Sequence, residues 1–230
     1  MKKEANTFTY LLVAGIVLLL IITSINIYSL SSLSDKLVGK RSSGLGLSKD
    51  VDDVNLASIR STGQSIAFLF PVEKIKTQQD AIDILIPRGT PEYGDALGVS
   101  YDDPVSALNK LARQTYPQIK AELKQDPVLW NRYLNLATKP VGISCEFCCG
   151  VGPTGISGDG ELTCGCSHNP AIHALTMWLM KNTDYSDAEI LREAIRWKSL
   201  WFPKDIVNLG LKASGGDIEE LDLPGMVGGC

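Results

Sequence analysis

Five of the six cysteines lie within 22 residues of one another, and this clustering restricts how the chain can fold more than any other feature. They form the pattern Cys-x-x-Cys-Cys-Gly, then a glycine-rich loop, then Cys-Gly-Cys-x-His. A Cys-x-x-Cys turn places two thiolates on one side of a tight loop, where both can bind a metal ion at about 2.3 Å. Glycine in the intervening loop allows the chain to fold back sharply. The spacing therefore predicts that the two ends of this loop meet around a metal ion.

The candidate metal ligands lie at both ends of this loop and in the helix expected after it. Helix N-termini favour negative charge, so a helix beginning at Asn169 and Pro170 would stabilise thiolates beside it. Four thiolates suit zinc best, although soft ligands also permit copper(I) or an iron–sulfur cluster. For the two histidines, a solvent-facing turn and a packed position in the helix remain the alternatives to ligation. The full candidate set is Cys145, Cys148, Cys149, Cys164, Cys166, His168 and His173.

Two other interpretations of the cysteines remain open. A disulfide framework suits a domain outside the cytoplasm, and six cysteines can pair evenly. Adjacent cysteines such as Cys148 and Cys149 are, however, awkward disulfide partners for each other. A thiol–disulfide oxidoreductase acting through Cys145 and Cys148 is the enzymatic alternative, although no βαβ pattern surrounds this Cys-x-x-Cys sequence. The sequence places metal binding first, in a structural or metal-handling role, and leaves open whether the chain is an enzyme.

The N-terminal segment predicts a single membrane-spanning helix. No charged side chain occurs between Ala5 and Ser34, and residues 8–27 are predominantly apolar. About twenty residues that rise roughly 1.5 Å each span a hydrocarbon core of about 30 Å. A cleaved signal peptide is the competing interpretation, but the apolar stretch is long and no Ala-x-Ala site follows it. We expect a retained single-pass anchor in the lipid bilayer with the domain outside the cytoplasm, since long C-terminal domains translocate largely regardless of charge.

The rest of the sequence predicts a mainly α-helical fold: one transmembrane helix followed by a small helical domain with a Cys/His-rich loop. Helix-start signals recur as Thr-x-x-Asp at 77–80, Asp-Pro at 103–104 and 126–127, and Ser-x-x-Glu at 186–189. Few segments alternate with a period of two, so strands should be minor. Helices over 170–183 and 186–201 should pack as a hairpin beneath the cysteine loop, and a short turn should follow Pro203. We divide the chain into a tail and transmembrane anchor (1–34), a stalk (35–60), a helical region (61–140) and a Cys/His-rich helical region with a Gly-rich acidic tail (141–230).

The charge balance restricts the partners. The net charge is −4, and residues 1–34 contribute +1, so the remainder carries −5. Nucleic-acid-binding domains need a basic face, and we therefore expect no nucleic-acid partner. The lipid bilayer is the predicted partner of the anchor, and any protein partner is unknown.

Several motifs together resemble an uncharacterised, prokaryotic and largely archaeal family of membrane-anchored cysteine-rich proteins. They are CEFCCG, CGCSHNPAIHAL, YSDAEIL and the closing MVGGC, and the resemblance covers roughly residues 71–230. It implies a tethered cysteine-rich domain and no particular activity. More distantly, CGCSH followed by a helix and a Ser-Asp-x-Glu-Ile helix is similar to small proteins with a PCYCGC motif, although the leading Pro-Cys-Tyr is absent here.

Overall fold

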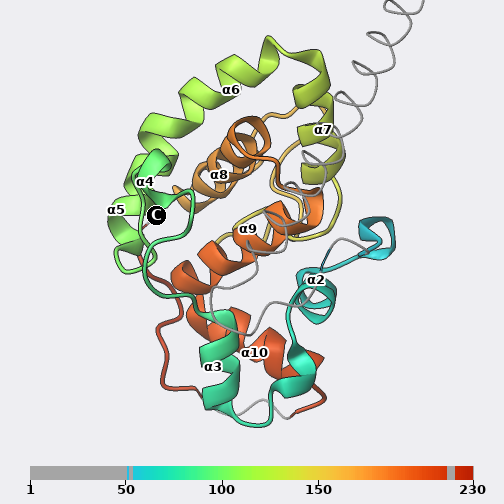
Figure 1. Ribbon diagram of the computed structural model, residues 1–230, viewed down its shortest axis with the longest axis vertical. Coiled ribbons are helices and arrows are strands. Elements are labelled where there is room, and N and C mark those ends of the chain that lie inside the picture. Colours follow the sequence, from blue (N-terminus) through green and yellow to red (C-terminus); the bar gives the residue numbers. More distant parts are fainter. Residues whose placement is uncertain (1–50, 52–53, 217–220, 230) are drawn as a thin grey trace, which may run out of the picture. The chain divides into compact units, whose positions relative to one another are not determined.

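The computed structural model describes residue 51, residues 54–216 and residues 221–229 (Figure 1). These residues belong to the second of the two units into which the chain divides, Lys49–Cys230. The anchor predicted over residues 8–27 lies outside the described residues. Within the described ranges, no helix is both long and apolar enough to cross a bilayer.

The described part of the chain is mainly helical, as the sequence predicts. It contains no strand, and β-pairing there is confined to isolated bridges in the loop between α7 and α8. In chain order the elements are the short 3-10 helix η1 (Leu56–Ser58), α2 (Thr62–Leu69), the 3-10 helix η2 (Val72–Lys74), α3 (Gln78–Leu85), α4 (Gly94–Leu97), α5 (Pro104–Lys110), the π-helical turn η3 (Leu111–Thr115), α6 (Tyr116–Lys124), α7 (Pro127–Ala137), α8 (His168–Asn182), α9 (Asp187–Trp201) and α10 (Pro203–Ala213).

Four helices begin where local capping signals predict. Capping boxes start α3 at Thr77 and α9 at Ser186, where each hydroxyl accepts a backbone N–H and the acid three residues later reaches back. Asp-Pro pairs start α5 and α7, and the carboxylates of Asp103 and Asp126 accept N–H groups of the first turn. These four predicted starts are confirmed. The sequence alone could predict them because the interactions that define each start span only three or four residues.

Two helices differ from the expectation. Helix α8 begins at His168, two residues before Pro170, because the first four N–H groups of a helix need no intrahelical partner and proline fits among them. After Pro203 the chain forms the eleven-residue helix α10 instead of a short turn. Proline at the first helical position fixes a helical φ there, so the residue that ends α9 also starts α10.

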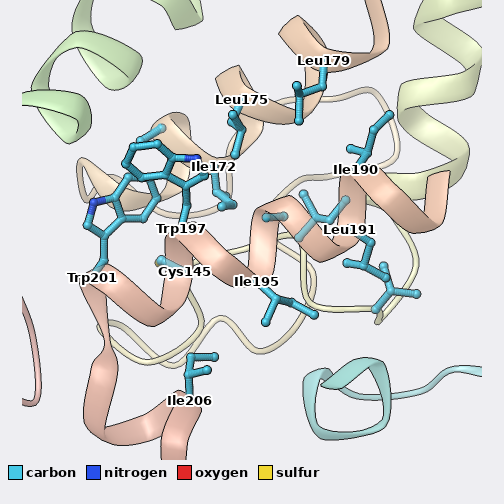
Figure 2. Packing of buried hydrophobic residues seen from close by; sticks show 14 of the residues in the cluster. Cys145, Ile172, Leu175, Leu179, Ile190, Leu191, Ile195, Trp197, Trp201 and Ile206 are labelled. Atoms are coloured by element: carbon cyan, nitrogen blue, oxygen red, sulfur yellow. The ribbon is translucent and has the colours of Figure 1, made fainter. Parts of the chain in front are cut away.

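The core is centred on α8 and α9. Helix α8 is buried on nearly all sides because α6, α7, α9 and η3 pack against it. Figure 2 shows the apolar side chains of α8 and α9 meeting, with Trp197 and Trp201 in tilted ring contact at one end. Both tryptophans have no exposed surface, and each fully buried large apolar side chain contributes about 1.5–3 kcal/mol. The predicted packing of these two helices beneath the cysteine loop is confirmed.

The start of the described chain is tied to the same core. Val51 and Ile59, at the end of the segment predicted as a stalk, are both buried. Helix α2 then packs on α9 and α10. The Ser65 hydroxyl of α2 donates to the carbonyl oxygen of Val141 at 2.6 Å. Helix α2 therefore supports the first residues of the cysteine loop.

Candidate metal centre

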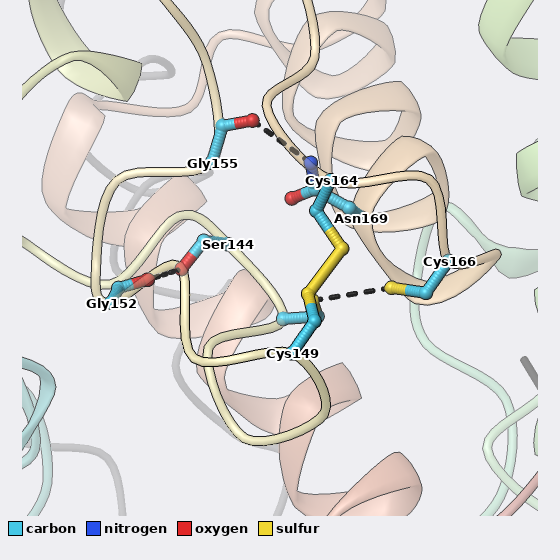
Figure 3. The surroundings of a disulfide bond; sticks show 8 residues. Ser144, Cys149, Gly152, Gly155, Cys164, Cys166 and Asn169 are labelled. Atoms are coloured by element: carbon cyan, nitrogen blue, oxygen red, sulfur yellow. Dashed lines mark hydrogen bonds between the residues drawn. A yellow bond between two sulfur atoms is a disulfide. The ribbon is translucent and has the colours of Figure 1, made fainter.

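The loop between α7 and α8 folds back on itself and brings the two cysteine groups together. An antiparallel bridge pairs Glu146 with Gly152, and the Ser144 hydroxyl donates to the Gly152 carbonyl oxygen at 2.6 Å (Figure 3). Gly150 and Gly152 both adopt positive φ, +69° and +74°, a conformation that glycine adopts without strain. The Cys-x-x-Cys-Cys-Gly sequence therefore forms a tight reversal, as its glycines predict.

Four sulfur atoms converge in this loop. The Sγ atoms of Cys145, Cys149, Cys164 and Cys166 all lie within 4.8 Å of one another. Four thiolates that surround an ion at about 2.3 Å form a tetrahedron with edges of about 3.8 Å, which is close to this spacing. Cys149 and Cys164 are joined by a disulfide, while Cys145 and Cys166 are thiols 3.3 Å apart. The same four sulfurs thus form a compact cluster that can hold a metal ion once the disulfide is reduced.

The four cysteines differ in exposure and in protonation. Cys145, Cys164 and Cys166 are buried, whereas Cys149 is exposed. The hydrogen bond from Cys145 lowers the pKa of Cys166, and His168 and the backbone N–H of Asn169 lower it further. The same hydrogen bond and burial raise the pKa of Cys145. Cys145 therefore keeps its proton while Cys166, just before the N-terminus of α8, is the thiolate of the pair.

A buried lysine supports the loop from α9. Lys198 has no exposed surface, and its Nζ donates to the Gly142 carbonyl oxygen at 2.9 Å and to Glu146 Oε2 at 3.0 Å. Thr62 of α2 donates to the same carboxylate oxygen at 2.5 Å. Burial lowers the pKa of Lys198, and the charge of Glu146 opposes that shift. This ion pair fixes the residue that follows Cys145, and sequence analysis missed it because its partners are far apart along the chain and no local pattern connects them.

The two histidines lie outside the group of four sulfurs. His168 Nε2 lies 3.0 Å from the Val227 carbonyl oxygen, and its ring packs on Trp201 and Phe202. Because a carbonyl oxygen only accepts, Nε2 is the donor in this hydrogen bond. Cys148 is half-buried and its sulfur is likewise not among the four. Of the seven predicted ligands, the structure brings four together; the sixth cysteine, Cys230, lies outside the described residues.

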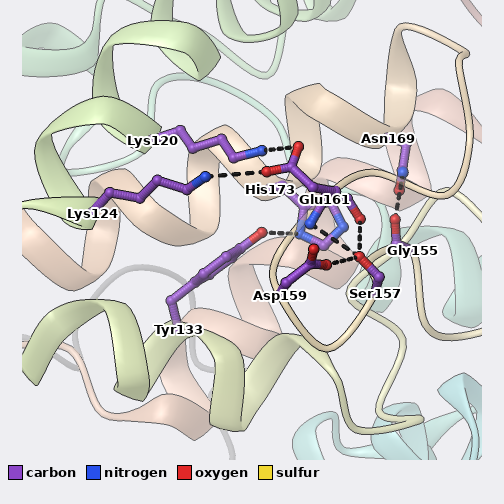
Figure 4. Close-up of polar contacts among 9 residues, drawn as sticks. All are labelled: Lys120, Lys124, Tyr133, Gly155, Ser157, Asp159, Glu161, Asn169 and His173. Carbon is purple, nitrogen blue, oxygen red and sulfur yellow. Dashed lines mark hydrogen bonds and ion pairs between the residues drawn. The ribbon is translucent and has the colours of Figure 1, made fainter. Parts of the chain in front are cut away.

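A second polar cluster ties the glycine-rich loop to α6, and α7 to α8 (Figure 4). Lys120 and Lys124 hold the Glu161 carboxylate at 2.8 and 3.1 Å. His173 is completely buried, and its Nδ1 lies 3.0 Å from the Tyr133 hydroxyl. Burial lowers the pKa of His173 to about 3, so its ring is neutral in the folded protein. The structure thus places His173 in the core. A packed position in the helix was the sequence-based alternative to metal ligation for this residue.

No family model, no curated protein and no solved structure matches this chain. The site is therefore defined by its geometry and its donor chemistry.

Proposed function

We propose that this chain is a membrane-anchored protein that binds one soft metal ion, with zinc as the preferred metal. The proposed ligands are Cys145, Cys149, Cys164 and Cys166. The convergence of four sulfurs within 4.8 Å of one another carries the proposal. Thiolates favour zinc or copper(I) over the hard cations, which prefer oxygen ligands. Four protein ligands leave no open position for a substrate, which suits a structural or metal-handling role better than metal-catalysed hydrolysis.

The test is metal binding by the full-length chain in detergent micelles, reduced and kept anaerobic. We expect one zinc ion per chain, and cobalt substitution should give the intense visible absorption of a tetrahedral cobalt thiolate. Cys166→Ser should abolish stoichiometric binding, because it removes a ligand that the N-terminus of α8 stabilises. Cys148→Ser is the matched control and should bind zinc normally, since its sulfur is outside the group. A reduced wild-type chain without zinc, or equal loss in both variants, would refute the proposal.

The second candidate function is thiol–disulfide exchange, and one observation favours it. The Cys149–Cys164 disulfide lies beside the Cys145–Cys166 thiol pair, and all four sulfurs lie within 4.8 Å of one another. A thiolate such as Cys166 is the species that attacks a disulfide sulfur. A metal-free chain that catalyses reduction of an added disulfide peptide, with Cys166→Ser inactive, would favour this function over metal binding.

A further inference from the structure

The four clustered sulfurs are not equivalent toward reagents in solution. Cys149 is exposed, while the other three members of the cluster are buried. Cys149 is also already paired with a buried neighbour, Cys164, in the disulfide. Susceptibility to oxidation follows thiolate character and exposure, so reagents from solution reach the cluster first at Cys149.

We propose that Cys149 and Cys164 form an oxidant-reactive site for peroxide-class oxidants, in which Cys149 is attacked and Cys164 resolves the product. Oxidation at this site would release a bound metal ion, and that part of the inference rests on the function proposed above. The reactivity of Cys149 is independent of that function. Metal binding and oxidation then exclude each other, because they use the same two sulfur atoms.

The chemistry balances with hydrogen peroxide as the oxidant. The Cys149 thiolate attacks one peroxide oxygen, the O–O bond breaks, and a sulfenic acid and hydroxide form. The Cys164 thiolate then attacks that sulfur, an S–S bond forms and a second hydroxide leaves. Two protons convert the two hydroxides to water. Two thiolates together lose two electrons, and one peroxide molecule gains them.

Oxidation removes half of the ligand set. After the disulfide forms, Cys145 and Cys166 are the two members of the cluster that remain thiols, as in the structure. Structural zinc sites are four-coordinate, so the two sulfurs that remain do not retain the ion. Reduction of the disulfide restores the four-sulfur site.

The experiment uses the full-length chain in micelles, reduced and loaded with zinc, and adds one equivalent of hydrogen peroxide. A chromogenic chelator follows zinc release, and mass spectrometry of peptides maps the new disulfide. We expect release in step with formation of the Cys149–Cys164 bond. In the reduced chain without metal, Cys149→Ser should consume peroxide at least about tenfold more slowly than the wild type, because the remaining sulfurs of the cluster are buried. Cys148→Ser should consume peroxide, and release zinc once loaded, at the wild-type rate.

A second measurement uses metal-free, reduced Cys164→Ser protein, in which the sulfenic acid loses its resolving partner. A dimedone label should then accumulate on Cys149. If the reduced chain binds no zinc but the label appears on Cys149, the metal proposal fails and the reactive site stands. Labelling of Cys148 instead of Cys149, or zinc that stays bound after the disulfide has formed, would overturn this inference.

Discussion

Replacing Lys198 by methionine tests how strongly the helical core holds the cysteine loop. Methionine keeps most of the stem but removes the ammonium group, which bonds Gly142 and Glu146. A hydrogen bond to a charged group contributes about 1.5–3 kcal/mol, and breaking a buried ion pair from one side costs about 3–5 kcal/mol. The Glu146 side chain is 14% exposed and regains some hydration, which places the expected loss at the lower end, about 3 kcal/mol.

The assay is urea unfolding of the full-length chain, followed by tryptophan fluorescence. All four tryptophans lie in the helical unit, so the signal reports on it. With a slope of about 2 kcal/mol per molar urea, the midpoint should fall by about 1.5 M. Lys198→Met should also weaken zinc binding, because Lys198 holds Glu146, the residue that follows the proposed ligand Cys145.

Two comparisons decide whether the reasoning holds. Lys181 forms an exposed ion pair with Glu122 on the same core, and Lys181→Met should cost less than about 1 kcal/mol. Adding Glu146→Gln to Lys198→Met removes the stranded charge and should recover at least about 1 kcal/mol. Equal midpoint shifts for Lys198→Met and Lys181→Met, with no recovery in the double variant, would refute a structural role for the buried pair.

Three further changes test other parts of the structure. Gly155→Ala would place a Cβ 2.2 Å from Asn169 Oδ1 and 2.9 Å from His173 Nε2. The variant should lose about 1–3 kcal/mol of folding stability, measured as a lower thermal midpoint. Gly158→Ala, where the added Cβ meets open space, should change the midpoint little. In the folded protein the pKa of His173 is lowered to about 3, whereas in the unfolded chain it is 6.5. Below pH 6.5 the imidazole therefore binds a proton in the unfolded state and not in the folded state. Stability should therefore fall by up to about 1.4 kcal/mol per pH unit between pH 6.5 and 5, and urea titrations of His173→Asn should show a flatter slope. Each aspartate placed at residues 18–20 should cost about 3 kcal/mol of membrane insertion. The triple variant should therefore be extracted from membranes by alkaline carbonate, whereas the wild type should stay in the membrane pellet. Extraction of the wild type would contradict the predicted anchor.

Local rules predicted much of the helical pattern, and long-range contacts account for most of what they missed. The boxes at Thr77 and Ser186 and the Asp-Pro pairs each fix a helix start within one turn, so the sequence alone locates them. The π-helical turn that joins α5 to α6 was missed, because Pro117 predicts a new start, whereas the packing of η3 on α8 keeps the chain helical through it. The length of α10 was missed for a similar reason: its buried face is defined by α2, α3 and α9.

The candidate site divides in the same way. Cysteine spacing and glycine content predicted that the two ends of the loop converge, and the structure brings four of the sulfurs together. Spacing could not determine which cysteine is left out, because Cys148 and Cys149 are adjacent and only the folded loop decides which of the two sulfurs joins the group. Nor could it identify Lys198, whose role depends on how α9 packs under the loop.

The way the loop is held bears on what a bound ion does there. Besides the sulfurs, polar contacts from the helices hold the loop, among them Ser65 to Val141, Lys198 to Gly142, Thr62 to Glu146, and Asn169 to Gly155 at 2.8 Å. Small zinc domains unfold without metal because they lack a core of their own, whereas this loop lies on a helical unit with an extensive buried core. We therefore expect that an ion bound here is not needed to build the fold and that its loss would leave the sulfurs gathered. A site that keeps its shape through loss of the ion suits reversible metal handling and thiol oxidation better than a permanent structural staple.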